Sequence, residues 1–299
     1  GDMAWLSQIL LAAEEPAGLG RVAACCADPA PGGGFELAPK IMSRADESQQ
    51  EALTAASTRR LTLVQGPPGS GKTRMAILQA RLWVASGRKP VLLAAENDVA
   101  VDSLVAGCAE AQLQVVRVGG EASRRDLREH CLSEKVRNSG FPFGELHEWT
   151  GEQEILGVAD VVCCTCSNSD HPAIKGLRFA TVLVDEAAQA TEPMTLVPLL
   201  DLNPDGCVAL VGDQRQLPAV VACAPAAAEG LGTSLFERLA TLGVPPMFLG
   251  TQYRMHPAIA AFPCRSYRGR LAPGVHGVQR AAPEGIAWPV PEAPVAFLA

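Results

Sequence analysis

An eight-residue glycine-rich segment, Gly66 to Thr73, constrains the fold of this chain more than any other feature. It fits the pattern G-x-x-x-x-G-K-S/T, in which glycines let backbone N–H groups turn inward around a phosphate. The apolar run Leu61–Val64 before it predicts a strand, and residues Thr73 to Ser86 after it predict a helix that ends at Gly87. A strand, this turn and a helix in direct succession predict an α/β fold that presents a helix N-terminus to the phosphates of a nucleotide.

Two side chains of this segment are expected to meet the nucleotide directly. Lys72 is predicted to bridge the β- and γ-phosphates, and the Thr73 hydroxyl to be a ligand of Mg²⁺. The alternative is a glycine-rich turn with an exposed lysine, which the flanking strand and helix disfavour. With ATP and Mg²⁺ as the cofactors, the predicted binding residues of the segment are Gly66, Pro67, Pro68, Gly69, Ser70, Gly71, Lys72 and Thr73.

A pair of adjacent acids follows a second apolar run. Asp185 and Glu186 come directly after Thr181–Val184, so we expect them at the carboxyl end of a strand, where open α/β sheets bind ligands. Asp185 is predicted to anchor Mg²⁺, and Glu186 to orient or deprotonate the attacking water. The alternative is two surface acids at a strand end, which the phosphate-binding segment upstream disfavours.

An amide and a guanidinium complete the predicted catalytic set. Gln216 follows the apolar strand Cys207–Val211 on the same edge as the acids, where a neutral amide can bond to a γ-phosphate or to the attacking water. An arginine beside the γ-phosphate can accelerate phosphoryl transfer by ~10³–10⁵, and this role is assigned to Arg254. Tyr253 offers an aromatic face to a base, although simple packing is an equally open interpretation for Tyr253 and for His256.

The rest of the chain continues the alternation of strands and helices. Asn97 is the predicted N-cap of one helix, and the charged residues 121–156 are predicted to form a small helical insertion that stands off the sheet. We therefore assign residues 46–262 to one α/β domain, with weakly patterned residues 1–45 before it and an extended Pro-rich segment, 263–299, after it. Strands separated by helices imply a parallel sheet covered on both faces. The further predicted strands are Pro90–Ala95, Gln114–Val118 and Asp160–Thr165.

Composition excludes several classes of protein. No run approaches the ~18 consecutive apolar residues of a membrane span, so no membrane partner is expected. Ten cysteines include Cys163 and Cys166 at the C-x-x-C spacing of a zinc site, but no second pair follows, and reduced, structural cysteines in an intracellular protein are predicted instead. Because the net charge is −7, any contact with nucleic acid is expected to be a local track on a negatively charged body, or to be supplied largely by another domain.

The chain resembles superfamily-1 helicases from about Ser48 to Phe297, specifically the branch that contains the nonsense-transcript regulator, senataxin and the immunoglobulin-μ-binding helicase. The spacing of its motifs and the insertion before Ala159 look closest to the nonsense-transcript regulator. The resemblance rests on the four elements above and on further strings, which are Val101-Asp102-x-Leu104, Ala159 through Cys166, Asp185 through Pro193, Ser234 through Leu239 and Gln252 through Phe262.

The resemblance implies a RecA-like motor domain that hydrolyses ATP and moves along single-stranded RNA or DNA. Of the two nucleic acids, we expect RNA. It implies that Gln49, in Ser48-Gln49-x-x-Ala52, reads adenine, that Tyr253 packs near adenine, and that Arg254 contacts the γ-phosphate. We further expect a monomer in the cytoplasm or the nucleus, with RNA-decay or transcript-processing proteins as partners.

In this family the nucleic acid crosses the segments that correspond to Ala95–Asp102 and Thr165–Ser167. The resemblance therefore implies nucleic-acid contacts from Asn97, Thr165 and Ser167. Glu96 departs from the family pattern, because it stands where a serine faces the nucleic-acid backbone, and a carboxylate there should repel phosphates.

The second departure concerns domain content. These helicases have a second RecA-like domain, and we expect this chain to end where that domain would begin, with a remnant of the N-terminal accessory barrel at most in residues 1–45. The chain alone is then expected to be weakly active, binding ATP–Mg²⁺, hydrolysing it slowly and unwinding no duplex.

Two alternatives to a motor domain remain. The first is a non-motor nucleotide-binding scaffold derived from a helicase, which the acidic charge and Glu96 favour but Glu186 and Gln216 disfavour. The second is a small-molecule kinase with a phosphate loop, which leaves Gln252–Pro257 unexplained.

Overall fold

A computed structural model of the chain describes residues 38–140 and 145–275, together with isolated positions near both ends. For residues 145–148 the description covers the backbone alone. Most of residues 1–45, where a remnant of the accessory barrel is expected, and nearly half of the segment 263–299 lie outside the described residues. Within that segment, residues 263–266 are helical and not extended as predicted.

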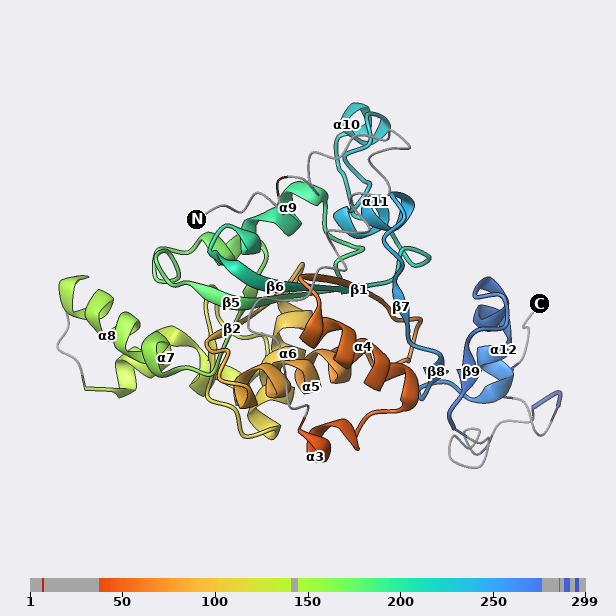
Figure 1. Cartoon of the computed structure of the whole chain (residues 1–299), viewed down its shortest axis with the longest axis horizontal. Helices are drawn as coiled ribbons and strands as arrows, with labels where there is room; N and C mark the ends of the chain where they lie inside the picture. Colours follow the sequence, from red (N-terminus) through yellow and green to blue (C-terminus); the bar gives the residue numbers. More distant parts are fainter. Residues whose placement is uncertain are drawn as a thin grey trace.

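A parallel sheet of seven strands forms the centre of the described structure, in the order β3-β4-β2-β5-β6-β1-β7 (Figure 1). Strand β1, which leads into the glycine-rich segment, lies two positions from β5, which ends at Asp185, so both reach the same edge of the sheet. The strands are β1 Leu61–Gln65, β2 Val91–Ala95, β3 Val115–Arg117, β4 Val161–Thr165, β5 Phe179–Asp185, β6 Leu202–Gly212 and β7 Met247–Phe248.

The central strands are mostly apolar because helices cover both faces of the sheet. Every residue of β1, β2 and β4 is buried. Successive side chains of a strand point to opposite faces, so Leu61 and Leu63 of β1 enter one hydrophobic cluster and Val64 enters the other. Continuous apolar runs of this kind are typical of doubly covered parallel sheets.

Helices α4, α5 and α6 pack on one face, and α9 and α11 lie over the other (Figure 1). The helices of the described residues are α3 Pro39–Met42, α4 Glu47–Thr58, α5 Lys72–Ala85, α6 Asp98–Glu110, α7 Leu132–Asn138, α8 Glu145–Val158, α9 Glu192–Leu196, α10 Ala224–Ala228, α11 Leu235–Thr241 and α12 Pro257–Ser266, with short 3₁₀ turns η1 Arg125–His130, η2 Ser167–Asp170 and η3 Val197–Leu199. A separate two-stranded pair, β8 Thr251–Gln252 with β9 Ala272–Pro273, lies beside α12.

This arrangement confirms the predicted α/β class and the RecA-like fold. Helix α6 begins as expected, because the Asn97 side chain accepts a hydrogen bond from the Ala100 amide at 2.9 Å. The elements that the sequence analysis did not predict include the short edge strand β7 and helix α4. The sequence contained a signal for α4, since Asp46 and Gln49 form a capping box in which each side chain bonds the other residue's backbone N–H.

Residues 121–156 contain the turn η1 and the helices α7 and α8, which extend to one side of the sheet (Figure 1). The segment is helical, as predicted, but its inner residues are anchored to the edge of the sheet. Leu132 and Leu156 are buried in the same cluster as Val116 of β3, and Cys131 forms a parallel bridge with Arg117 at the end of β3. The insertion packs there because its apolar residues cover the edge of the sheet, which a charge-based interpretation of the segment overlooked.

The cysteines and the membrane prediction can be compared with the described residues. Cys163, Cys164 and Cys166 are buried and free, and no group of three or more His, Cys, Asp or Glu side chains in the described part of the chain could hold a metal ion. The C-x-x-C pair therefore belongs to the core around β4. Within the described ranges, no helix is both long enough and apolar enough to span a membrane.

Phe236 of α11 is fully buried and should be a major contributor to folding stability. We expect Phe236→Ala to lower the free energy of unfolding by about 3–5 kcal/mol, because the lost apolar contact leaves a cavity. Phe262→Ala is the matched control, since Phe262 is 80% exposed, and should change stability by less than about 0.5 kcal/mol. Urea denaturation measures both, and equal losses would contradict the assignment of Phe236 to the core.

Candidate nucleotide and metal site

The glycine-rich segment forms a tight loop between β1 and α5. Gly69 and Gly71 have φ values of +77° and +83°, which side chains disfavour, so these two positions let the chain reverse into the first turn of α5. A Cβ on Gly69 would lie 2.6 Å from the Cβ of Arg254, so the Gln252–Pro257 segment packs directly on the loop. The Ser70 hydroxyl is buried and has no hydrogen-bond partner among the described residues.

Lys72 spans the loop toward the second predicted motif. Its Nζ donates a hydrogen bond to the Gly66 carbonyl at 3.1 Å and lies 3.4 Å from Oε1 of Glu186. The side chain of Lys72 is only 10% exposed and that of Glu186 24%, so this ion pair is partly shielded from solvent. Lysine and glutamate are thus held together at the mouth of the phosphate loop.

Thr73 and Asp185 meet at the point where α5 begins and β5 ends. The Thr73 hydroxyl donates to Oδ2 of Asp185 at 3.1 Å, although the two residues are 112 positions apart. A hydroxyl and a carboxylate are the hard oxygen ligands that Mg²⁺ prefers. The two predicted metal ligands therefore lie close enough together to bind the same ion.

Burial sets the charge state of Asp185. The carboxyl is almost completely inaccessible, and this desolvation, followed by the nearby negative charge of Glu186, raises its pKa from 3.8 to about 6. Lys72 and the hydrogen bonds from the Glu186 amide and Thr73 oppose this rise. A bound cation would stabilise the ionised form of Asp185 and so offset the cost of its burial.

Glu186 adopts an unusual backbone conformation beside this acid. Its φ is +53°, in the left-handed region that non-glycine residues seldom occupy, and its amide donates to Oδ1 of Asp185 at 3.0 Å. The side-chain amide of Gln189 donates to Oε2 of Glu186 at 3.3 Å. The turn therefore holds the Glu186 carboxylate between Lys72 and Gln189, facing the phosphate loop.

Gln216 reaches the loop through a buried aspartate that sequence reasoning did not assign to the site. Its side-chain amide donates to Oδ2 of Asp213 at 2.8 Å and lies 3.5 Å from the Gly66 carbonyl. Asp213 also accepts from the side chain of Gln65 at 3.1 Å and from the Tyr267 hydroxyl at 2.6 Å. Burial and the Asp213 carboxylate raise the pKa of Tyr267, so Tyr267 is a firm donor here. Asp213 lies between the predicted strand Cys207–Val211 and Gln216, whereas nothing in the sequence pointed to Gln65 or Tyr267.

Tyr253 and Arg254 are carried by a turn that is hydrogen-bonded to the phosphate loop. The Tyr253 amide donates to the Gly69 carbonyl at 2.8 Å, and buried Gln252 accepts from the Arg254 amide at 3.1 Å. The Arg254 side chain is exposed beside the loop. His256 is the N-cap of α12, where its Nδ1 accepts from the Ala258 amide at 3.1 Å, so capping accounts for this residue.

Gln49 and Tyr253 converge through Asp46, a second residue that sequence reasoning missed. The Gln49 side chain donates to the Ser70 carbonyl at 3.1 Å, which ties α4 to the phosphate loop. The Tyr253 hydroxyl donates to Oδ2 of Asp46 at 2.7 Å, and burial together with this bond raises the pKa of Tyr253 to about 12. The two predicted adenine-contacting residues therefore flank one corner of the loop.

The predicted nucleic-acid residues lie at the carboxyl ends of β2 and β4. The Cys166 amide donates to the Ala95 carbonyl at 2.8 Å, which places the two segments side by side. The Thr165 hydroxyl is 3.0 Å from that of Ser167, and Asn97 and Ser167 are exposed. Next to them, half-buried Glu96 keeps one carboxylate oxygen without a hydrogen-bond partner among the described residues, and burial raises its pKa.

Comparisons with known proteins identify relatives of this chain. Two family profiles, both described as AAA domain, match residues 44–140 with 145–224 and residues 231–299. The chain is 37% identical over 281 residues to the Arabidopsis thaliana regulator of nonsense transcripts 1 homolog, covering 84% of this chain and 22% of that protein. It is 35% identical to the Schizosaccharomyces pombe ATP-dependent helicase upf1, covering 88% of this chain and 32% of that protein.

A solved arterivirus nonstructural protein 10 (helicase) with DNA is 18% identical, with a TM-score of 0.46 over 77% of this chain and 44% of that one. The chain thus spans between about a fifth and a third of the length of these two curated relatives.

The raised pKa of Asp185 predicts a pH-dependent stability difference. Between about pH 4 and 6 the folded protein holds this proton more tightly than the unfolded chain, so ionised Asp185 destabilises the fold above pH 6 and no longer does so below pH 4. A pKa of about 6 instead of 3.8 corresponds to at most roughly 3 kcal/mol. In EDTA, Asp185→Asn should therefore be more stable than the wild type at pH 7.5, with a gain that disappears toward pH 4.

Urea denaturation across this pH range measures the difference. Asp205→Asn, at an exposed position, controls for the loss of one negative charge. A loss of stability in Asp185→Asn that is the same at every pH would show that Asp185 is not a destabilising buried charge.

Proposed function

The chain belongs to the family of AAA-domain helicases that includes the regulators of nonsense transcripts, and we propose that it is an ATP-hydrolysing motor domain that acts on single-stranded nucleic acid. The observation that carries the proposal is the meeting of Thr73 with Asp185 at 3.1 Å, beside Lys72 and Glu186 at 3.4 Å. Hydrolysis of a nucleoside triphosphate requires a phosphate loop, a pair of metal ligands and a carboxylate that can act as a base. All three lie at this corner of the sheet, with Glu186 as the carboxylate.

The residues present fit ATP and Mg²⁺. The Ser70 hydroxyl, which has no hydrogen-bond partner among the described residues, lies in the loop that would wrap the phosphates. The buried carboxylate of Asp185 accepts hydrogen bonds from Thr73 and from the Glu186 amide and forms no salt bridge within the described residues. Thr73 and Asp185 would hold Mg²⁺. When bound, the ion offsets the negative charge of the β- and γ-phosphate oxygens.

Lys72 supports an exchange of partners on nucleotide binding. Its ammonium now lies between the Gly66 carbonyl and the Glu186 carboxylate. Phosphate oxygens in the loop would compete for the same ammonium, and the carboxylate of Glu186 would then be released from this ion pair. Glu186 would then accept a proton from the attacking water, which makes its activation depend on the presence of the nucleotide.

Gln216 and Arg254 are proposed to respond to the γ-phosphate. Gln216 is oriented by Asp213 at 2.8 Å and lies 3.5 Å from the Gly66 carbonyl, so its amide adjoins the loop without adding charge. Arg254 is carried by a turn whose backbone bonds to Gly69. Because Tyr267 also bonds to Asp213, the segment that follows the arginine is connected to the same buried carboxylate.

Single-stranded nucleic acid, with RNA preferred, is proposed to cross Asn97, Thr165 and Ser167. These residues share the carboxyl edge of the sheet with the nucleotide site, so one edge could couple the two ligands. Glu96 is expected to weaken this contact by repelling phosphates.

The wider assignments are proposals of the same kind. The names of the relatives support a role with RNA-decay or transcript-processing proteins, in the cytoplasm or the nucleus. We propose one ATP-binding domain over residues 46–262, and slow hydrolysis without duplex unwinding by this 299-residue chain alone.

A non-motor scaffold is the second candidate function, favoured by the net charge of −7 and by the position of Glu96. It predicts nucleotide binding without any response to nucleic acid. The motor proposal predicts that single-stranded RNA accelerates phosphate release.

We expect Lys72→Ala to weaken the binding of a fluorescent ATP analogue by about 10–100-fold, because charge-assisted hydrogen bonds to phosphate are lost. Lys89→Ala is the matched control, since Lys89 lies on the surface in an ion pair with Asp160. It precedes β2 and is therefore at the opposite edge of the parallel sheet from the loop. Equilibrium titration measures the affinities. Equal affinities of Lys72→Ala and wild type would refute the assignment of the nucleotide site.

We expect Glu96→Ser to strengthen the binding of a single-stranded oligoribonucleotide by about threefold to tenfold at low salt, because removal of one nearby negative charge is worth about 1 kcal/mol. Glu51→Ser, on the exposed side of α4, makes the same chemical change elsewhere and should have no effect. Fluorescence anisotropy and RNA-dependent phosphate release test the prediction. If neither wild type nor variant responds to RNA, the scaffold function replaces the motor function.

A further inference from the structure

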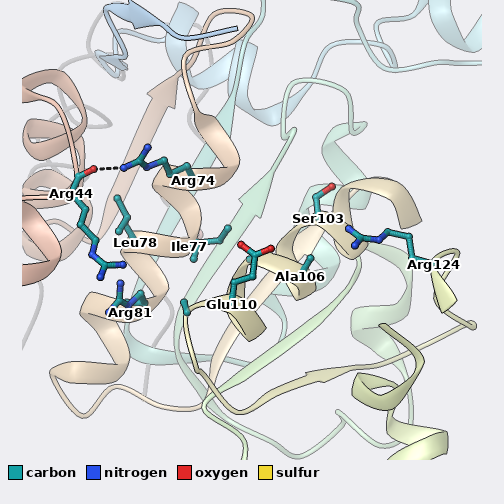
Figure 2. A pocket seen from close by; sticks show the side chains of 11 residues that line it. Arg44, Arg74, Ile77, Leu78, Arg81, Ser103, Ala106, Glu110 and Arg124 are labelled. Atoms are coloured by element: carbon teal, nitrogen blue, oxygen red, sulfur yellow. Dashed lines mark hydrogen bonds between the residues drawn. The ribbon is translucent and has the colours of Figure 1, made fainter. Parts of the chain in front are cut away.

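A cavity of about 550 Å³ opens between helices α5 and α6, and none of its lining residues belongs to the phosphate loop (Figure 2). Arginines Arg44, Arg74, Arg81 and Arg124 line it, together with the apolar side chains of Ile77 and Leu78. We propose that this cavity binds an acidic, amphipathic peptide segment of a partner protein. The proposal does not depend on nucleotide hydrolysis.

The charge of the cavity is unusual for this chain. Four arginines and one glutamate line it, on a protein whose net charge is −7. The guanidinium groups of Arg44 and Arg81 lie on the same side of the cavity (Figure 2), and neither has a hydrogen bond or an ion pair within the described residues. Two neighbouring cations without a carboxylate repel each other, and an anionic ligand would relieve that repulsion.

The other two arginines are positioned by local contacts. Arg74 donates to the Arg44 carbonyl at 2.6 Å, which joins the start of α5 to the segment after α3 (Figure 2). Arg124 pairs with Asp126 on the opposite wall. The uncompensated positive charge of the cavity therefore comes from Arg44, Arg74 and Arg81, which carboxylates spaced along one peptide could reach.

The apolar lining selects a peptide rather than a nucleic acid. Leu78 is buried and Ile77 half-buried along α5, and Gly107 of α6 packs closely against the Ile77 side chain. Proteins that bind single strands usually stack bases on aromatic side chains, and none of the described residues that line this cavity is aromatic. Apolar side chains of a peptide can instead fill the floor while its acids pair with the arginines.

The probe for a test is a fluorescein-labelled 16-residue peptide that carries Glu and Leu at helical spacing. We expect it to bind the full chain, and its affinity to fall by about tenfold or more in Arg44→Glu and in Arg81→Glu, because each change reverses a charge at the cavity. Arg178→Glu is the matched control, since Arg178 is exposed and lies outside the cavity, and should bind the probe as the wild type does.

Two control peptides separate the charge from the apolar contacts. Replacement of every Glu by Gln, or of every Leu by Ser, should weaken binding by about tenfold or more. Fluorescence anisotropy measures all affinities, circular dichroism verifies folding, and Arg44→Gln with Arg81→Gln replaces any variant that fails to fold.

The proposal would be overturned by no binding at millimolar peptide, or by affinities that do not change in the cavity variants. Displacement of the probe by a single-stranded oligonucleotide of the same charge at equal concentration would also overturn it, in favour of a nucleic-acid site. A failure of ATP binding would leave these results unaffected, because the titrations contain no nucleotide.

Discussion

The hydrogen bond between the Thr73 hydroxyl and the Asp185 carboxylate depends on two elements that lie far apart in the chain, the first turn of α5 and the end of β5. It requires the glycine loop to deliver α5 to the carboxyl edge of the sheet, and β6 to lie between β1 and β5. The cost of burying Asp185 is visible in its raised pKa. A buried acid that a cation would stabilise is the basis of the proposed chemistry at this corner.

Around this contact the site is maintained by polar groups that satisfy one another. Asp213 accepts hydrogen bonds from Gln65, Gln216 and Tyr267, so three separate segments are fixed relative to the loop. Gln49 performs a comparable task by bonding to the Ser70 carbonyl. Such networks are strong in a low-dielectric setting only when every member has a partner, which explains why residues from distant parts of the chain are needed.

The charge distribution is uneven in a way that the net charge conceals. The nucleotide site contains the carboxylates of Asp185 and Glu186, and Glu96 lies on the same edge of the sheet. Guanidinium groups are grouped in the cavity between α5 and α6. The nucleotide site and the cavity share helix α5, which carries Lys72 and Thr73 at its start and Arg81 near its end. A protein with an acidic surface can therefore still present one strongly positive site, because local grouping decides what a ligand meets.

Much of the fold was readable from local patterns. The order of strands and helices, the phosphate loop and the acids after β5 follow from apolar runs, glycine spacing and strand-end positions, which are properties of neighbouring residues. The packing of residues 121–156 on the sheet edge did not follow, because Leu132 and Leu156 meet Val116 only in three dimensions. Only folding brings Asp46, Gln65 and Tyr267 to the site, and only folding brings Arg44, Arg74, Arg81 and Arg124 to one cavity.

The sequence by itself determined which chemical groups are available and which elements carry them. Tertiary structure alone decided which groups lie within hydrogen-bond distance, because such contacts depend on the relative placement of segments separated by many residues.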